Sequence, residues 1–122
     1  MVVAVDIDDT LCVDDYGPFE NREPKADMVK LVQRLYEMGH QILIVTARPD
    51  RLRDLTIQWL AKYGILYHQL IMEKPRADVY IDDRAMRPDE AVEKLNEVLD
   101  EQLRLRKAEG GLSVRLAAMA AG

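Results

Sequence analysis

The sequence predicts an α/β fold, Rossmann-like and three-layered, in which helices cover both faces of a central parallel sheet. Short unbroken apolar runs alternate along the chain with longer segments whose apolar residues recur every three or four positions. The first pattern is typical of strands buried on both faces, and the second of amphipathic helices. Such alternation favours right-handed crossovers and parallel strands. Ligands of these sheets bind outside the carboxyl ends of the strands, so polar residues that follow the strands should converge there.

Two strands and the helix between them are predicted in the first part of the chain. The first strand covers roughly residues 2–7, and the polar residues 8–24 that follow it have no helical periodicity and are expected to form a loop or small hairpin. A helix is expected at about residues 25–38, where apolar residues recur with helical spacing. Gly39 is a natural helix terminator, and residues 41–46 contain the second buried strand.

The middle of the chain repeats this pattern with a second helix and two short strands. Pro49 and Asp50 open the helix, with Asp50 expected as its N-cap, and Gly64 ends it. The third strand is expected at residues 67–72 and the fourth at residues 78–81. Charged residues follow both strands, which places those residues at the carboxyl edge of the predicted sheet.

A last helix and a tail complete the predicted organisation. The helix begins near Pro88, which suits a first-turn position, and the Gly-Gly pair at residues 110–111 is expected to break it. The Ala-rich residues beyond are assigned no function. Because a chain of 122 residues suits one compact domain, residues 1–109 are predicted to form a single domain and residues 110–122 a C-terminal tail.

Composition and charge restrict the classes of function that remain. The net charge of −5 disfavours a general binder of nucleic-acid backbones. Cys12 is the only cysteine, so no internal disulfide can form and a reducing cytoplasm is the expected location. No secretory signal is predicted, because Asp6 and Asp8 interrupt the first apolar run, and no stretch is long enough to span a bilayer.

Polar residues follow each predicted strand, in the order acid, hydroxyl, ammonium and acid. Asp6 and Asp8 lie two positions apart, so they project to the same side and repel each other unless something neutralises them. A divalent cation is the simplest answer, and Mg²⁺ prefers hard oxygen ligands of this kind. Thr46 can hydrogen-bond a phosphate oxygen and Lys74 can neutralise a phosphate. With the acidic pair at residues 82–83, these groups suffice for phosphoryl transfer, although each alone also fits a structural role.

This combination resembles the haloacid dehalogenase-like (HAD) phosphohydrolase superfamily, over roughly residues 1–98. The first motif of that family, Asp-x-Asp-x-Thr, is matched by residues 6–10, and its second, a Thr or Ser that closes an apolar strand, by Thr46. The lysine of the third motif is matched by Lys74, and the acidic pair of the fourth by residues 82–83. Lys74 lies unusually close to the fourth motif, with no helix between them.

The resemblance also implies roles for individual residues. Asp6 would be the nucleophile that forms an aspartyl-phosphate, and Asp8 the general acid and base. The backbone carbonyl of Asp8 would also ligate the metal. Asp83 would complete the Mg²⁺ site in preference to Asp82, because Asp83 falls one step beyond the strand. The implied catalytic set is Asp6, Asp8, Thr46 and Lys74, the metal set is Asp6, Asp8, Asp82 and Asp83, and the candidate substrate-binding residues are Thr10, Arg48 and Arg84.

Most members of that family carry a cap domain, inserted after the first or the third strand. Residues 9–24 and 72–77 are too short to form one here, so the chain resembles the capless type. Residues 74–85 look like the corresponding stretch of small phosphatases from capsule or surface-polysaccharide biosynthesis. Their Ile-Asp-Asp-Arg sequence is also similar to polynucleotide 3′-phosphatase domains.

The leading expectation is a Mg²⁺-dependent phosphomonoester hydrolase that acts on a sugar phosphate or similar small metabolite. One alternative is a nucleotide or polynucleotide 3′-end phosphatase, and another is a non-catalytic HAD-fold regulatory or scaffold domain. The expected partner is a small phosphorylated substrate, with nucleic acid disfavoured by the net charge and no membrane partner. Specificity is expected to lie in residues 14–22, in Arg48, Arg51 or Arg84, or in a second subunit of a homo-oligomer that closes the open site.

Overall fold

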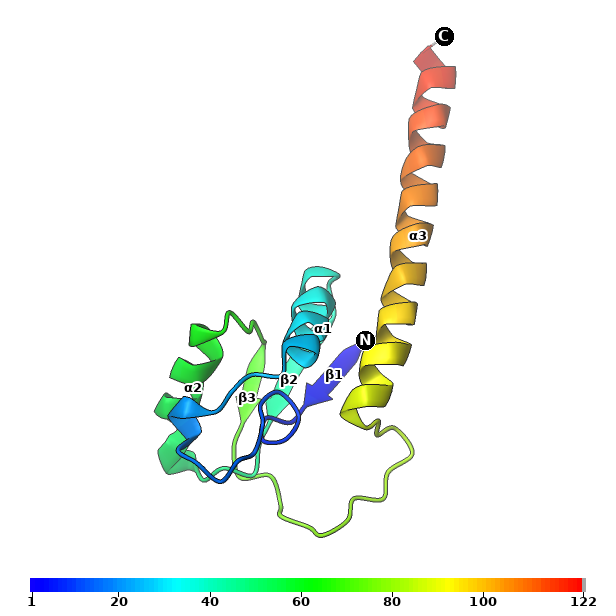
Figure 1. The fold of residues 1–122 in the computed structure, drawn as a ribbon. Helices are drawn as coiled ribbons and strands as arrows, with labels where there is room; N and C mark the ends of the chain where they lie inside the picture. Colours follow the sequence, from blue (N-terminus) through cyan, green and yellow to red (C-terminus); the bar gives the residue numbers. More distant parts are fainter. Residues whose placement is uncertain (122) are drawn as a thin grey trace.

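The chain folds as a parallel sheet with helices packed against it (Figure 1). The computed structural model describes residues 1–121, and the side chains of residues 1–110. Strands and helices alternate along the chain, with a short 3₁₀ turn before each of the first two helices. Their bounds are Val2–Val5 for β1, Phe19–Asn21 for the first turn, Ala26–Glu37 for α1, Gln41–Val45 for β2, Asp50–Leu52 for the second turn, Arg53–Lys62 for α2, Gln69–Ile71 for β3 and Pro88–Ala121 for α3.

The sheet contains three parallel strands in the order β1-β2-β3. Val3 lies opposite Ile42 across the first strand pair, which fixes the register of β1 against β2. Because the strands run the same way, their carboxyl ends lie at one edge, where the chain continues into Asp6, Thr46 and Met72. The predicted Rossmann-like α/β class with a parallel sheet is confirmed, and the sheet edge at which the predicted site residues should meet is present.

Apolar side chains of the sheet and of the helices form one core. Ile42 and Ile44 of β2 are fully buried, whereas the alternate residues Leu43 and Val45 are only partly so. One face of the sheet is therefore better covered than the other, as period-2 alternation requires. The helices bury the stripes that their spacing predicts, which include Met28, Leu31, Val32 and Leu35 of α1, and Trp59 and Leu60 of α2.

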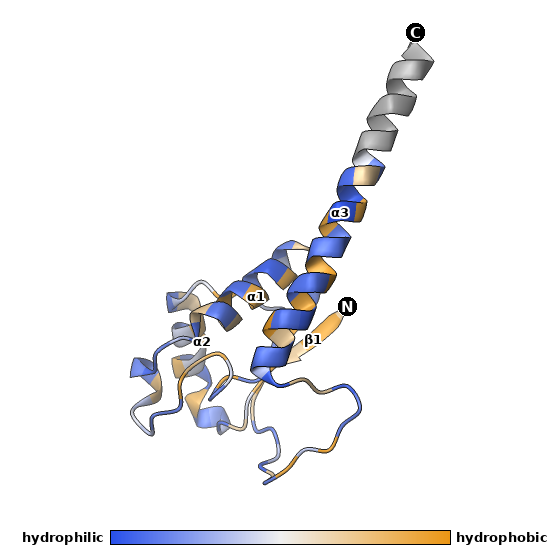
Figure 2. Cartoon of the chain, turned by 45° about the vertical axis from the view of Figure 1, so that its right-hand side comes forward, coloured by the Kyte–Doolittle hydropathy of each residue, from blue (hydrophilic) through white to orange (hydrophobic). Residues whose placement is uncertain are grey.

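Helix α3 packs its first turns against α1 and then extends away from the domain (Figure 1). Leu99 anchors it in the core with no exposed surface. Polar contacts flank this anchor, since Arg34 of α1 donates to the side chain of Asn96 at 3.0 Å and pairs with Asp100 at 2.5 Å. Hydrophilic and hydrophobic residues alternate along this part of α3, as expected for a helix buried on one side (Figure 2).

The predicted helix ends are confirmed at two glycines, but one predicted cap is wrong. Gly39 and Gly64 have φ angles of 90° and 66°, the left-handed conformation in which glycine ends helices. Asp50, expected to cap the second helix, instead opens a 3₁₀ turn, and α2 begins only at Arg53. The Asp50 carboxylate accepts a hydrogen bond from Arg53 Nε at 3.0 Å, so it is engaged by a side chain rather than by helix N–H groups.

The fourth strand predicted at residues 78–81 is not formed. The segment between β3 and α3 has no regular structure and runs as a wide loop (Figure 1). Val79 and Ile81 are 72% and 97% exposed. Local contacts hold this segment, because Lys74 Nζ lies 4.4 Å from the centre of the Tyr80 ring and the Tyr80 hydroxyl donates to the carbonyl of Pro75. Three apolar residues between charged ones gave too short a pattern to fix a strand.

The break predicted at residues 110–111 is also wrong, because α3 continues without interruption to Ala121. Gly110 has no neighbour within 4 Å that a side chain could meet, so nothing there requires glycine. Helix-favouring alanines and leucines beyond the pair offset the cost of two interior glycines, about 1 kcal/mol each. Within residues 1–121, none of the helices combines the length and the apolar character needed to cross a membrane.

Replacing Leu99 with Ala should detach the start of α3 from the core and lower the free energy of unfolding by about 2–5 kcal/mol. Leu105, on the same helix but 50% exposed, is the matched control, and Leu105→Ala should change that free energy by less than about 0.5 kcal/mol. Urea denaturation followed by circular dichroism measures both. Equal losses in the two variants would contradict the packing described for α3.

Candidate active site

A tight turn after β1 positions the two aspartates of the first motif. The backbone N–H groups of Thr10, Leu11 and Cys12 all donate to the carbonyl of Ile7, at 3.0, 2.8 and 3.2 Å. The side chain of Ile7 is fully buried in the core, which anchors the turn to the domain. Asp9 adopts a φ of 62°, which lets the chain reverse within this turn. The turn holds the carboxylates on either side of Ile7 at the carboxyl edge of the sheet.

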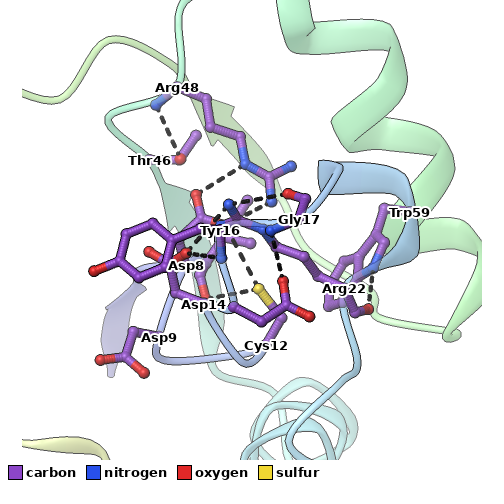
Figure 3. A network of polar contacts seen from close by, with 12 residues as sticks. Asp8, Asp9, Cys12, Asp14, Tyr16, Gly17, Arg22, Thr46, Arg48 and Trp59 are labelled. Atoms are coloured by element: carbon purple, nitrogen blue, oxygen red, sulfur yellow. Dashed lines mark hydrogen bonds and ion pairs between the residues drawn. The ribbon is translucent and has the colours of Figure 1, made fainter.

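Two arginines bind the carboxylate of Asp8 (Figure 3). Arg48 forms a two-point contact, Nε to Oδ2 at 2.9 Å and Nη2 to Oδ1 at 2.7 Å, and Arg22 Nη1 lies 2.7 Å from the same Oδ1. Burial acts to raise the pKa of Asp8, but the hydrogen bonds and charge of Arg48, followed by the charge of Arg22, outweigh it and hold this pKa below the ordinary value. Asp8 is therefore ionised and fixed.

Arg48 is an internal residue. Its side chain is 1% exposed, and its remaining donor Nη1 reaches the hydroxyl of Thr56 on α2 at 3.0 Å. Its backbone N–H donates to Thr46 Oγ1 at 3.2 Å, and its guanidinium carbon lies 4.4 Å from the centre of the Phe19 ring. Arg48 is a predicted substrate-binding residue, and in the structure its side-chain donors are directed at Asp8 and Thr56, so it holds the Asp8 carboxylate in place.

Arg22 reaches Asp8 from the segment between β1 and α1. It also pairs with Asp14 at 3.2 Å, and its guanidinium carbon lies 4.4 Å from the same Phe19 ring that contacts Arg48. The backbone carbonyl of Arg22 accepts a hydrogen bond from Trp59 Nε1 at 2.9 Å, which ties this segment to α2. Arg22 thus joins a surface loop, a core helix and an acidic residue of the site.

Asp6 has a different environment. Among residues 1–110 no arginine forms an ion pair with it, its side chain is 36% exposed, and Lys74 Nζ lies 3.9 Å from Oδ2. Burial raises the pKa of Asp6 above the ordinary value, against the hydrogen bond from the Ile7 N–H at 2.8 Å and the charge of Lys74. Lys74 is held at the edge of β2, since its backbone N–H donates to the carbonyl of Thr46 at 2.8 Å. Asp6 is the under-neutralised carboxylate of the pair.

Cys12 lies beneath the pair and is chemically quiet. Its sulfur is 3.5 Å from Asp8 Oδ1, and the residue is fully buried. Burial, followed by the charge of Asp8, raises the pKa of the thiol to about 11. Cys12 is therefore a neutral packing residue at physiological pH.

A cleft of about 780 Å³ opens in front of the two aspartates. The turn after β1 and the start of α1 form one side, and the loop between β3 and α3 forms the other. Basic side chains face acidic ones across it, so the cleft has mixed charge rather than a single sign. Its lining includes Asp6, Asp8, Thr10, Lys25, Asp27, Asp78, Tyr80 and Arg87.

The structure brings together only part of the predicted site. Asp6, Asp8 and Thr10 line the cleft. Lys74 lies beside Asp6, and its backbone N–H donates to the carbonyl of Thr46 at the end of β2. Three other predicted site residues are exposed on the loop between β3 and α3, where the fourth strand was expected. These residues, Asp82, Asp83 and Arg84, do not line the cleft. Asp82 Oδ1 accepts the backbone N–H of Arg84 at 2.8 Å, a purely local turn contact.

The donor set has consequences for a metal ion. Among the residues that the structure describes, no three His, Cys, Asp or Glu side chains form a group able to hold one. Asp6 offers a hard carboxylate that no arginine occupies, whereas both carboxylate oxygens of Asp8 are engaged by arginines. Of the two predicted metal-binding side chains that line the cleft, Asp6 is therefore the one whose carboxylate fits a cation in this arrangement.

Sequence analysis included Arg22 and Phe19 only in the segment expected to carry specificity, residues 14–22, and predicted neither their contacts around Asp8 nor the part of Thr56. A signal for Arg22 was present, because it is the only basic residue in residues 8–24, which contain six acidic ones. A lone arginine among many acids is expected to pair with the most buried of them. Phe19 and Thr56 carry no comparable signal, since an apolar ring in a loop and a threonine in a helix fit many roles.

Comparison with known proteins adds information about the fold. The chain matches no protein-family model and no curated protein sequence. Its fold resembles the crystal structure of an MCSG target from Vibrio cholerae, with 27% identity, a TM-score of 0.64, and coverage of 83% of this chain and 98% of that one. The name of that target implies no activity.

Two further similar structures come from larger assemblies. A chain of a Pnkp1/Rnl/Hen1 complex matches with 23% identity and a TM-score of 0.54, over 67% of this chain and 30% of that one. A chain of the Pnkp1/Rnl/Hen1 RNA repair complex matches with 22% identity and a TM-score of 0.52, over 76% and 29%. This chain therefore spans under a third of those two proteins, and at such identities the likeness is one of fold.

Removing the Arg48 guanidinium that binds the Asp8 carboxylate should destabilise the fold in a pH-dependent way. Arg48→Met is expected to lower the free energy of unfolding by about 3–5 kcal/mol at pH 7, because it breaks a buried ion pair on one side only. Since the pKa of Asp8 is lowered on folding, the stabilisation is present above the unfolded value of 3.8 and is lost as pH falls through the lower folded value.

Urea titrations of both proteins, from pH 7 down to below pH 4, measure this gap. Arg104→Met, which removes an exposed arginine paired with Glu101, is the control and should be nearly neutral. A gap between wild type and Arg48→Met that stays constant with pH would contradict the role assigned to Asp8.

Proposed function

We propose that the chain is a HAD-like phosphohydrolase that cleaves phosphate monoesters through an aspartyl-phosphate on Asp6. One observation carries this proposal. Of two aspartates beside a 780 Å³ cleft, Asp8 is immobilised by two arginines, whereas Asp6 faces the cleft with only Lys74 nearby, at 3.9 Å. A carboxylate that is accessible and only partly neutralised is suited to nucleophilic attack.

The neighbouring groups support each part of this reaction. An oxygen of Asp6 would attack phosphorus while the bond from phosphorus to the leaving oxygen breaks, and water would then release phosphate from Asp6. Lys74 would stabilise the phosphoryl oxygens beside Asp6. Asp8, kept ionised by Arg48 and Arg22, is suited to take a proton from that water. The same arginines oppose its protonation, so transfer of a proton to the leaving oxygen draws on a minor form of Asp8.

Mg²⁺ is the cofactor that we propose for this site. The Asp6 carboxylate and the backbone carbonyl of Asp8 would hold it, and when bound it would neutralise charge on the phosphate and on Asp6. Asp83 remains the preferred further ligand on sequence grounds, ahead of Asp82. Both lie on the exposed loop between β3 and α3, so in the described arrangement neither supports Asp6.

A small phosphorylated metabolite, most simply a sugar phosphate, is the proposed substrate class. The narrower resemblance of residues 74–85 points to surface-polysaccharide biosynthesis, and a lone buried Cys12 fits a reducing cytoplasm. A nucleotide or polynucleotide 3′-end phosphatase is the second candidate, favoured by the fold similarity to chains of an RNA repair complex. The net charge of −5 and the acidic residues in the cleft argue against a long nucleic acid. Retention of Asp6 and Asp8 argues against a non-catalytic scaffold.

Asp6→Asn should abolish turnover and leave the fold intact or more stable. The variant removes the nucleophile, so phosphate release should fall by more than roughly a thousand-fold. It also removes a carboxylate whose pKa is raised by burial, so the melting temperature should stay level or rise. Phosphate-release assays over sugar phosphates, nucleotides and 3′-phosphorylated oligonucleotides, together with thermal melts, test both statements. Near-wild-type activity in the folded variant would refute the proposed nucleophile.

Activity should require Mg²⁺ and disappear in chelator, because Asp6 would otherwise repel the substrate phosphate. Asp83→Asn and Asp82→Asn provide a matched pair on one exposed loop. If Asp83 completes the metal shell, its variant should need more Mg²⁺ for half-maximal activity, whereas the Asp82 variant should not. Equal behaviour of the two variants would leave Asp6 as the main metal ligand, and full activity in chelator would remove the metal from the proposal.

A further inference from the structure

The loop formed by residues 13–23, here called the 13–23 loop, is built more rigidly than its position on the surface requires. Its base is closed by a hydrogen bond from the Val13 N–H to the carbonyl of Glu23 at 2.9 Å. At its tip, Asp14 Oδ1 accepts the backbone N–H of Tyr16 at 3.3 Å, and Asp15 Oδ1 accepts that of Gly17 at 2.9 Å. A Cβ at Gly17 would lie 2.9 Å from Asp15 Oδ1, so a larger residue there would displace the Asp15 carboxylate from this contact.

Arg22 connects this tip to the active site. Its Nη1 lies 2.7 Å from Asp8 Oδ1, while its Nη2 lies 3.2 Å from Asp14 and 3.4 Å from the carbonyl of Gly17. One guanidinium, itself 7% exposed, therefore holds the loop tip and the Asp8 carboxylate at a fixed separation. The side chains at the loop tip therefore have a defined position relative to Asp8 (Figure 3).

The tip presents Tyr16. This side chain is 95% exposed, and its φ of 61° lies in the left-handed region, where a bulky residue is an outlier. Glycine would fit that backbone better, and the fold gains no burial from the ring. Phe19 of the same loop, in contrast, lies inward against Arg22 and Arg48. Figure 3 shows the Tyr16 ring directed away from Arg22 and Trp59. A strained, exposed aromatic residue on a rigid loop is typical of a ligand contact.

We propose that Tyr16 determines substrate specificity by stacking on a ring of the leaving group. The inference rests on the proposed function, in which Asp8 lies beside the leaving oxygen. Arg22 contacts both Asp8 and the carbonyl of Gly17, the residue after Tyr16, and we therefore place the leaving group on the Tyr16 side of Asp8. A sugar and a nucleobase share the required chemistry, since each offers a ring face that packs on an aromatic side chain.

Tyr16→Gly and Tyr16→Phe separate the ring from the backbone. Glycine adopts the positive φ without strain and removes the ring. Phenylalanine keeps the ring and the strained φ and loses only the hydroxyl. Leu66→Ala is the control, because Leu66 is 53% exposed on a different loop. The quantity measured is the ratio of kcat/KM for a ring-bearing substrate to kcat/KM for methyl phosphate. The ring-bearing substrates are a hexose 6-phosphate and a nucleoside 3′-monophosphate, which distinguish the two sources of the ring.

The ratio for the preferred ring-bearing substrate should fall about 5- to 100-fold in Tyr16→Gly, mainly through KM, as expected for the loss of one stacking contact. It should remain at the wild-type value in Tyr16→Phe and Leu66→Ala. A fall in the ratio for the hexose 6-phosphate identifies a sugar leaving group, and a fall in the ratio for the nucleoside 3′-monophosphate identifies a nucleoside. An unchanged ratio in Tyr16→Gly, or an equal fall in Leu66→Ala, would overturn the inference.

Calorimetric binding of the same ring-bearing compounds, with inorganic phosphate as the ring-free reference, keeps this inference separate from the proposed function. If the wild-type protein binds a ring-bearing phosphate more tightly than inorganic phosphate and Tyr16→Gly loses that difference, the role of Tyr16 stands even where no phosphate is released. Turnover without any dependence on Tyr16 would overturn this role and leave the proposed function in place. Equal binding of ring-bearing phosphate and inorganic phosphate, or none of either, would also overturn it.

Discussion

The carboxylate of Asp8 and its two guanidinium partners are the contact on which the rest of the site depends. Arg48 arrives from the end of β2 and Arg22 from the segment before α1, so one carboxylate joins three parts of the chain. Two buried arginines without this acid would each carry the desolvation cost of an unpaired charge. Thr56 and Phe19 complete the arrangement from α2 and from the 13–23 loop. The site and the packing of its surroundings are therefore one structure.

The same arrangement gives two chemically similar residues opposite properties. Asp8 has its pKa lowered and is held in place, whereas Asp6 has its pKa raised and faces the cleft. Only Ile7 lies between them in the sequence, and the difference in pKa arises from which of the two carboxylates the arginines reach. A pair of carboxylates whose environments push their pKa values apart is a common way to divide roles within an active site. Here the difference between the two pKa values arises from the buried guanidinium groups of Arg48 and Arg22, whose donors are directed at Asp8.

Much of the fold and half of the site followed from local patterns in the sequence. Buried strands such as Ile42–Val45 and the stripe of α1 are predictable because burial sets their periodicity, and Asp6, Asp8 and Thr46 meet because parallel strands end at one edge. The fourth strand failed because residues 78–81 could be stabilised equally by contacts within their own loop, as the Lys74–Tyr80 contact shows. The contacts of Arg22 with Asp8 and of Phe19 with Arg48 were not predicted, because these partners are distant in sequence and the pattern of a loop does not indicate such pairing.

The separation of Asp6 from the arginine cluster has an evolutionary consequence. Exchanging Asp6, the proposed nucleophile, removes its ion pair with Lys74 and leaves every buried interaction of Asp8 in place. A gene duplicate could thus lose chemistry in a single step while keeping a folded cleft and the aromatic tip of its loop. Under the proposed function, a descendant that binds a phosphorylated compound without hydrolysing it is one substitution away from this chain, whereas a change at Asp8 would remove the contact that holds the site together.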